Sequence, residues 1–168
     1  MAFQIDSRIN PELLGVAWMI GHWEGTGYGR QMGGETGDEY EFSVTVDFSE
    51  SGGNYLHYIM QLFETDDDGR PIKFLGMETG FWRPKENGEI EVLMAHPEGV
   101  AEVYIGTVDG GKIELRTDMV ARTVSADIPV TGGHRLYGHV DSDLMFAYDR
   151  GTTDFEMQPY VWARLKRA

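Results

Sequence analysis

The feature that most constrains the fold is a succession of short alternating segments that fills the chain beyond residue 40. Segment 41–48 (EFSVTVDF) alternates apolar and polar residues, and segment 112–118 (KIELRTD) does the same. Glycine-rich turns, such as those at 51–53 and 109–111, separate segments of this kind. The pattern predicts about nine or ten strands, with no helical segment between them.

The absence of helical connections predicts how these strands pair. Parallel neighbours need long crossovers, so the sheet is expected to be antiparallel and meandering. So many strands in one small domain close into a barrel or fold into a sandwich, and a barrel of about ten strands is too wide for side chains alone to fill. We expect an all-β, closed antiparallel barrel with a cavity, as one domain over residues 1–168, because a single N-terminal helical segment is followed only by strands.

One segment near the N-terminus is predicted to be a short helix. Asn10 is placed as the N-cap, Pro11 as the first helical residue, and Gly21 as the stop. The apolar stripe expected along 11–20 consists of Leu13, Leu14, Ala17 and Ile20. This helix is expected to cover one end of the barrel.

Composition excludes several classes of function. The 28 acidic and 14 basic residues give a formal charge of −14, which disfavours nucleic acid and anionic membranes as partners. The chain has no cysteine, which excludes disulfides and thiolate metal sites. The first ten residues do not match a secretion signal and no apolar run is long enough to span a membrane, so we expect a cytoplasmic protein.

The stretch GHWEGTGYG at 21–29 raises the question of a phosphate-binding loop. Such a loop needs a strand before its glycines and a helix after them, whereas here the order is reversed. In a strand, Gly25, Gly27 and Gly29 share one face, which lets another segment approach closely or leaves room for a ligand. The two interpretations stay open, with the close approach favoured for each single glycine.

Several motifs resemble those of the nitrobindins, a family of small haem-binding barrels distantly similar to fatty-acid-binding proteins. GHWEGTG fits the pattern G-x-W-x-G-x-G, ETGFWRP with AHPEG resembles the central hairpin, and YVWARLKR resembles the last strand. The opening motif is carried by Gly21, Trp23, Gly25 and Gly27, and Trp23 is expected to plug the closed, lipocalin-like end. These matches extend from about residue 11 to residue 167.

The resemblance implies a ten-stranded barrel whose cavity holds haem b. In typical members a histidine on the last strand ligates the iron, and the ferric form is associated with nitric oxide binding and peroxynitrite isomerisation. Here Tyr160 stands at the aligned position, and the five histidines all precede residue 140. Residues 31–34 also depart from the family pattern, and Arg122 replaces a lysine near the pocket mouth.

Further residues are candidates for the cavity wall. Tyr160 and Trp162 share one face of the last segment, and we assign that face to the cavity although the opposite face is the more apolar. The histidines and acidic residues form no metal-ligand pattern, so no metal site is expected outside a haem. The other expected lining residues are Arg122, His57, Met60, Met77, Phe81, Met94 and Phe146.

Two functions are considered, and the first is preferred because the histidine that ligates the iron in typical members is replaced here by Tyr160. In the first, the protein is a non-enzymatic binding module that holds a small apolar ligand and needs no cofactor. In the second, Tyr160 ligates ferric haem b and the protein acts on peroxynitrite or nitric oxide, as tyrosinate ligates haem in catalase. A phenolate needs a cation nearby, and Arg164 lies about 13 Å along the strand, too far to serve. A homodimer is also left open.

Overall fold

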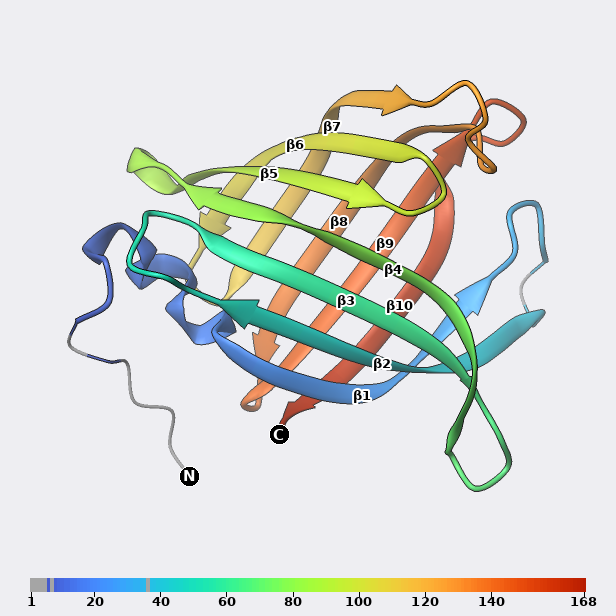
Figure 1. Cartoon of the computed structure of the whole chain (residues 1–168), viewed down its shortest axis with the longest axis horizontal. Coiled ribbons are helices and arrows are strands. Elements are labelled where there is room, and N and C mark those ends of the chain that lie inside the picture. The colour runs from blue at the N-terminus through green and yellow to red at the C-terminus, as the bar shows by residue number, and fades with distance from the viewer. Residues whose placement is uncertain (1–5, 7, 36) are drawn as a thin grey trace.

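Ten strands form a closed antiparallel barrel in the computed structural model, which describes residues 6, 8–35 and 37–168 (Figure 1). Each strand pairs with its neighbours in the chain, and the first pairs with the last. This confirms the predicted fold class. The strands are β1 (Gly21–Arg30), β2 (Glu39–Ser49), β3 (Leu56–Thr65), β4 (Pro71–Pro84), β5 (Glu89–His96), β6 (Val100–Asp109), β7 (Lys112–Arg122), β8 (Val130–Val140), β9 (Asp143–Thr152) and β10 (Gln158–Arg167).

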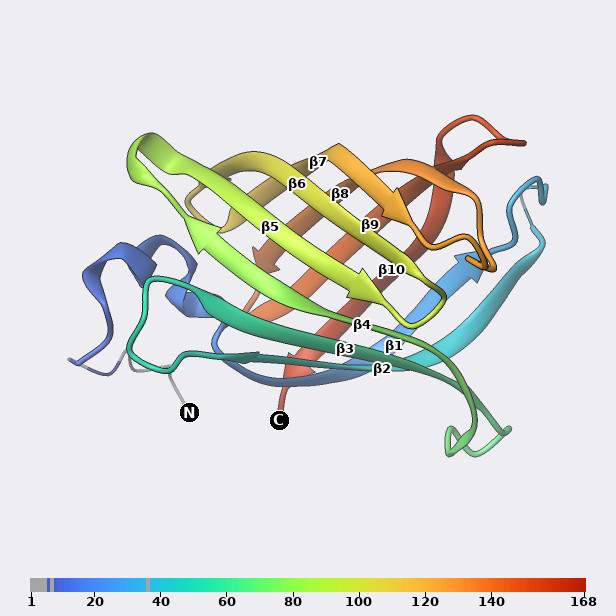
Figure 2. The same cartoon turned by 45° about the horizontal axis from the view of Figure 1, so that its top comes forward.

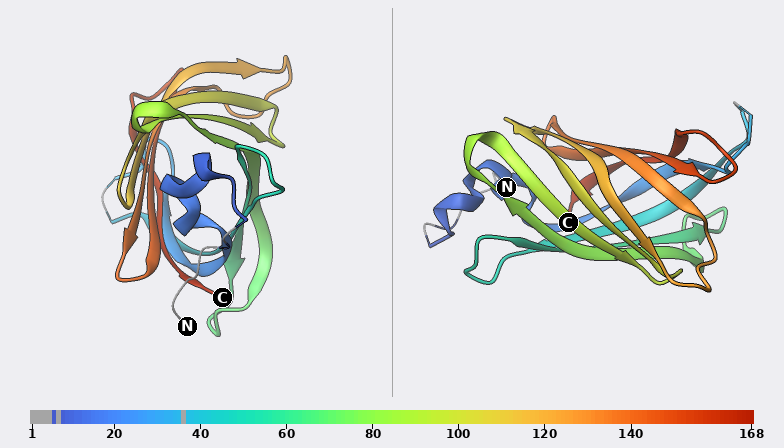
Figure 3. Two further views of the ribbon diagram at one scale, coloured as in Figure 1. Left: turned by 90° about the vertical axis from the view of Figure 1, so that its left-hand side faces the viewer. Right: turned by 90° about the horizontal axis from the view of Figure 1, so that it is seen from above.

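Two short 3₁₀ helices accompany the strands: η1 (Pro11–Met19) before β1 and η2 (Glu86–Gly88) in the turn between β4 and β5. Figure 2 shows the strands crossing the barrel obliquely around a single interior. In Figure 3, η1 lies across one end of that interior, as the sequence predicts. The opposite end therefore lacks this cover.

The helix η1 begins where the sequence predicts. It is a 3₁₀ helix, however, so its buried residues differ from those of the predicted apolar stripe. The Asn10 side chain accepts a hydrogen bond from the Glu12 backbone N–H at 3.0 Å. Because a 3₁₀ helix has three residues per turn, Leu13, Val16 and Met19 fall on one buried line. Leu14, which the predicted stripe placed on the buried face, is 53% exposed.

Trp23 joins η1 to the barrel. Its side chain is fully buried, and its indole N–H donates a hydrogen bond to the Met19 carbonyl oxygen at 2.7 Å. The guanidinium of Arg167 lies 4.1 Å from the centre of the indole ring. Trp23 thus packs at the end that η1 closes, where the sequence analysis places it.

Glycines on β1 allow the barrel to close against β10. Gly25 pairs with Leu165, and a Cβ atom on Gly25 would lie 2.1 Å from the carbonyl oxygen of Arg164. A Cβ atom on Gly27 would lie 2.4 Å from the carbonyl oxygen of Trp162. The space beside both glycines is taken by the backbone of β10, so these glycines serve a close approach of strands and not ligand clearance.

The interior changes character along the barrel axis. Near η1 it holds a cluster of aromatic rings in which Trp82 packs edge-on against Phe48 and Tyr137, with ring centres 5.3 and 4.8 Å apart. Farther along, the interior also holds buried charged side chains, those of Glu78, Glu102, Arg135 and Arg150. None of the described helices is long and apolar enough to cross a membrane. The N-terminal segment considered for a secretion signal falls mostly outside the described residues.

Candidate functional site

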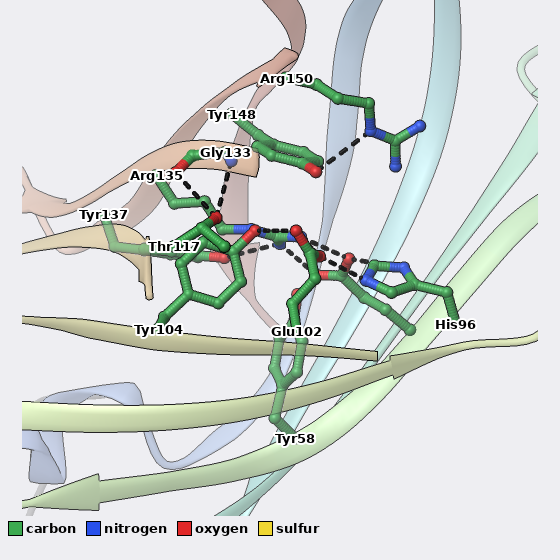
Figure 4. Close-up of polar contacts among 11 residues, drawn as sticks. Tyr58, His96, Glu102, Tyr104, Thr117, Gly133, Arg135, Tyr137, Tyr148 and Arg150 are labelled. Carbon is green, nitrogen blue, oxygen red and sulfur yellow. Dashed lines mark hydrogen bonds and ion pairs between the residues drawn. The ribbon is translucent and has the colours of Figure 1, made fainter. Parts of the chain in front are cut away.

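Three charged side chains are buried at the centre of the barrel. Glu78 on β4, Glu102 on β6 and Arg135 on β8 are each exposed by 3% or less. All three point into the barrel, because each lies on the same face of its strand as the buried residues two positions away. Figure 4 shows Glu102 and Arg135 converging with several tyrosines inside the barrel.

Arg135 is the centre of this group. It grips Glu78 through two parallel hydrogen bonds, from Nη1 to Oε1 at 2.5 Å and from Nη2 to Oε2 at 2.9 Å. Its Nε donates to the Tyr104 hydroxyl at 3.0 Å, and its Nη2 lies 3.7 Å from Oε2 of Glu102. The Tyr58 hydroxyl donates to Glu78 at 2.8 Å. Paired geometry of this kind compensates the loss of hydration of buried charges.

His96 completes the group from β5. Its Nε2 lies 2.7 Å from Oε2 of Glu102, and its Nδ1 lies 3.6 Å from Oε2 of Glu78. The sequence analysis had not identified a ligand role for this histidine. Both ring nitrogens face carboxylates, so His96 is a structural member of the buried group in this arrangement.

The pKa values of the two carboxylates follow from these contacts. Burial by itself raises the pKa of Glu78, but the charge of Arg135 and the hydrogen bonds from Arg135 and Tyr58 outweigh it and lower that pKa to about 2. The pKa of Glu102 is also lowered, because the hydrogen bond with His96 and the charge of Arg135 overcome its burial. Both carboxylates are therefore ionised near neutral pH.

A second arginine continues the polar interior toward the open end. The ring of Tyr148 lies between two guanidinium groups, with the Arg135 group 3.9 Å and the Arg150 group 5.2 Å from its centre. Arg150 donates from Nε to the Tyr148 hydroxyl at 3.1 Å, as drawn in Figure 4. Its guanidinium also lies 3.9 Å from the centre of the Tyr160 ring. Arg150 thereby links the buried group to Tyr160.

Tyr160 reaches the cavity because β10 contains an irregularity. Pro159 pairs with Asp149 and Val161 pairs with Tyr148, which leaves Tyr160 as an extra, unpaired residue. The buried residues of β10 are Val161, Ala163 and Leu165, so strict alternation would turn Tyr160 outward. Instead, Tyr160 and Val161 both line the same cavity.

The structure corrects the predicted direction of Trp162, because Tyr160 and Trp162 lie on either side of the end of this irregularity. The sequence analysis put Trp162 on the cavity face because it shares parity with Tyr160. In the structure Trp162 lies on the outer surface, where its ring packs 6.5 Å from that of Tyr28, a residue that is 45% exposed. The apolar face of β10, formed by Val161, Ala163 and Leu165, therefore points into the barrel, and Tyr160 lines the cavity although it is not on that face.

The cavity lies at the end of the barrel opposite η1 and has a volume of about 70 Å³. Its apolar lining comes mainly from β3 and β4, whose Glu78 is charged, and its phenolic and cationic lining comes from Tyr148, Arg150 and Tyr160 of β9 and β10. The lining residues are Tyr40, Met60, Leu62, Leu75, Gly76, Met77, Glu78, His96, Glu98, Tyr148, Arg150, Tyr160 and Val161.

The other residues expected in the cavity wall are divided between three environments. Met60 and Met77 line the cavity. Met94 and Phe146 are buried in the core but do not line it. The remaining three point elsewhere because they occupy outward or terminal strand positions: His57 bonds to Thr79 beside Phe81, which is 46% exposed, and Arg122 is exposed at the end of β7.

Sequence reasoning missed Glu78, Glu102, Arg135 and Arg150. The available signal was parity: each charged residue falls on the apolar, inward face of its segment, and both signs occur. Charges at inward positions of separate strands need one another as partners. Within the described part of the chain, no cluster of histidine and acidic side chains could hold a metal ion.

Comparison with known proteins gives concordant results. A family model described as "THAP4-like, heme-binding beta-barrel domain" matches residues 12–167. A "ferric nitrobindin-like protein" of Cutibacterium acnes is 54% identical over 169 residues, covering all of both chains. A "peroxynitrite isomerase" of Nocardioides sp. is 38% identical over 167 residues, covering 99% of each chain.

A solved structure shares the fold. The crystal structure of Rv2717c from M. tuberculosis superposes with a TM-score of 0.81 at 29% identity, covering 95% of this chain and 99% of that one. The family model and the two relatives each match nearly the whole of the chain. The protein therefore belongs to the THAP4-like, heme-binding β-barrel family, the nitrobindins.

Proposed function

We propose that this protein binds ferric haem b at the open end of the barrel, with the Tyr160 phenolate as the iron ligand, and that it acts on peroxynitrite or nitric oxide. The observation that carries the proposal is the position of Tyr160, which the irregularity in β10 turns into the cavity. Family membership and the names of the two relatives support it.

The donor chemistry of the cavity suits ferric iron. Phenolate oxygen is a known ligand of haem iron, and a positive charge close by favours the ionised form of a phenol. Arg150, whose guanidinium packs on the Tyr160 ring, is the cation that the sequence analysis could not find. His96 also lines the cavity, but both its ring nitrogens face carboxylates, so Tyr160 is the better candidate.

The volume of the cavity sets a condition on the proposal. At about 70 Å³ the cavity is well below the ~300–1,000 Å³ of typical ligand pockets, so a haem does not fit this closed arrangement. Leu75, Met77 and Arg150 have long side chains in the wall and would have to turn aside. Bound haem would supply an iron centre for nitric oxide or peroxynitrite. The chain would supply its anchoring phenolate and a water-poor pocket.

The proposal is tested by titrating haemin into the haem-free protein and recording absorbance spectra. We expect the wild type to give a saturable complex with a tyrosinate-type spectrum, and Tyr160→Phe to lose it. Trp162→Phe, two residues along β10 on the outer face, is the matched control and should bind as the wild type does. Equal binding by wild type and Tyr160→Phe would refute Tyr160 as the ligand, and an imidazole-type spectrum would point to His96.

A second candidate function is favoured by the small volume. In this case the barrel holds a small ligand directly, without haem, in the small cavity at its open end. Met60, Leu62 and Met77 line one side of the cavity and Arg150 the other, so such a ligand would be amphipathic. The sequence analysis, in contrast, predicted an apolar ligand. Native mass spectrometry of the purified protein separates the two candidate functions, because the mass of the bound molecule would be that of haem in the first case and that of a smaller ligand in the second.

A further inference from the structure

Arg150 is a buried cation that has no carboxylate partner in the described part of the chain. Arg150 is only 7% exposed, and the hydroxyl of Tyr148 accepts the hydrogen bond from its Nε. Among the residues that the structure describes, no carboxylate lies within ion-pairing distance of its guanidinium. Figure 4 shows the Nε of Arg150 directed at the Tyr148 hydroxyl, with the two terminal nitrogens on the other side of the guanidinium.

The nearby carboxylates are engaged elsewhere. Glu78 takes both parallel hydrogen bonds of Arg135, and Glu102 bonds to His96 and Tyr104. Glu98 also lines the cavity but forms no ion pair with Arg150. The charge of Arg135, which is of the same sign, also acts on Arg150 and lowers its pKa.

Arg150 nevertheless remains charged. Burial lowers its pKa, but the neighbouring Tyr148 and Tyr160 oxygens more than compensate and leave the pKa raised. A buried guanidinium without a counter-charge is unfavourable, and proteins normally supply a carboxylate or a bound anion to such a group. Arg150 lines the cavity, and the two terminal NH₂ groups of a guanidinium offer parallel donors.

We propose that Arg150 anchors a binding site for a small planar oxyanion, either a free ion of the nitrate type or the carboxylate end of an amphipathic ligand. The forked donors of a guanidinium match two oxygens of such an anion. The phenolic side chains of Tyr40, Tyr148 and Tyr160 stand in the same wall and can supply further donors. A volume of about 70 Å³ has room for a few water molecules, which is the size of such a group.

This inference concerns the haem-free protein and does not require haem binding. It gives the second candidate function its chemistry, because the carboxylate would bind Arg150 while an attached apolar chain contacts Met60, Leu62 and Met77. The inference therefore rests on the second candidate function only where the ligand is a carboxylate with an apolar chain. A short anion such as nitrate needs Arg150 alone.

The test is a titration of haem-free protein with sodium nitrate, acetate and hexanoate at constant ionic strength in chloride, followed by the ¹⁵N NMR signal of the arginine Nε–H groups and by calorimetry. Sulfate, which is tetrahedral, is a comparison ion. We expect saturable shifts of one arginine Nε–H, and weakening by about 10- to 100-fold in Arg150→Gln, the effect of losing a charge-assisted hydrogen bond. Glu98→Gln should tighten binding, since it removes a negative charge from the wall.

Two controls keep the result interpretable. Arg164→Gln removes an exposed arginine of β10 that pairs with Asp143 at 2.6 Å, and it should bind anions as the wild type does. Arg150→Lys keeps the charge but lacks the fork, and it should bind with intermediate strength. The fold of each variant is checked by circular dichroism and thermal unfolding.

The outcomes separate the proposals. Hexanoate binding much tighter than acetate would identify an amphipathic carboxylate, and equal binding of nitrate and acetate would identify a small free anion. Absence of saturation at about 10 mM, or equal binding by wild type and folded Arg150→Gln, would overturn the inference. Haemin binding is measured separately, so anion binding without haemin binding would reject only the haem proposal.

Discussion

The guanidinium of Arg150 lies 3.9 Å from the centre of the Tyr160 ring, at the open end of the barrel. The two residues come from neighbouring strands, β9 and β10, and meet because Tyr160 is the unpaired residue of the β10 irregularity. Tyr148 packs edge-on against Tyr160 with ring centres 5.6 Å apart, so the pair is held from the inner side. This contact places a cation beside the proposed iron ligand.

Replacing Tyr160 by histidine should strengthen haem binding. Neutral imidazole is a good ligand of haem iron at pH 7 and, unlike a phenol, needs no deprotonation. We expect haemin to bind Tyr160→His more tightly than wild type, with an imidazole-type absorbance spectrum. The gain will be limited by the small cavity, which must open in both proteins. Identical spectra and affinities for the two proteins would contradict Tyr160 as the ligand.

Stability should fall in acid through the Glu78 carboxylate. Its pKa is about 2 in the folded protein against an ordinary value of 4.5, so its contribution is complete above about pH 4.5 and is lost as the pH falls toward 2. The check is the free energy of unfolding in urea, measured from pH 7 to pH 2. Glu78→Gln should flatten the slope between pH 4.5 and pH 2.

The same variant should also destabilise the protein at pH 7. It leaves Arg135 without its paired carboxylate, which costs about 3–5 kcal/mol when one partner of a buried ion pair is removed. Glu64→Gln, which breaks an exposed pair with Lys73, is the control and should cost no more than about 1 kcal/mol. Equal losses in the two variants would show that the buried pair contributes no more than the exposed one.

Trp23→Ala should destabilise the closed end of the barrel by about 3–5 kcal/mol, the range for removing a large buried side chain. The indole is fully buried, and its loss also removes the hydrogen bond to Met19 and the contact with Arg167. Urea unfolding measures the change. Trp162→Ala, on the outer face, should cost clearly less, and a loss for Trp23→Ala within error of zero would be inconsistent with its packing.

Gly25→Ala should be destabilising although alanine is a small residue. The added Cβ atom would lie 2.1 Å from the Arg164 carbonyl oxygen, so β1 and β10 would have to separate, at about 1–3 kcal/mol or more. Gly138→Ala on β8 is the control, because its Cβ atom would meet nothing closer than 3.7 Å. Thermal unfolding of both variants should show a loss only for Gly25→Ala, and matching transitions would argue against close packing at the seam.

The sequence by itself predicted a closed antiparallel barrel of about ten strands and a capped helix at one end. Alternation with a period of two, glycine-rich turns and the N-cap at Asn10 are local signals, and each acts within a few residues. The family motifs likewise identified Trp23 and the glycines of β1 by their spacing. The sequence analysis named Met60 and Met77 as lining residues by residue type alone, and both line the cavity in the structure.

Only the tertiary structure decided which charges meet and where Tyr160 points. Glu78 and Arg135 are 57 residues apart and lie on strands that are not neighbours, so closure of the barrel alone brings them together. The direction of Tyr160 follows from its being the unpaired residue between β9 and β10. The irregularity interrupts the strict inward–outward alternation on which a prediction from sequence relies. Pairing between strands is a long-range property, and the cavity wall depends on it.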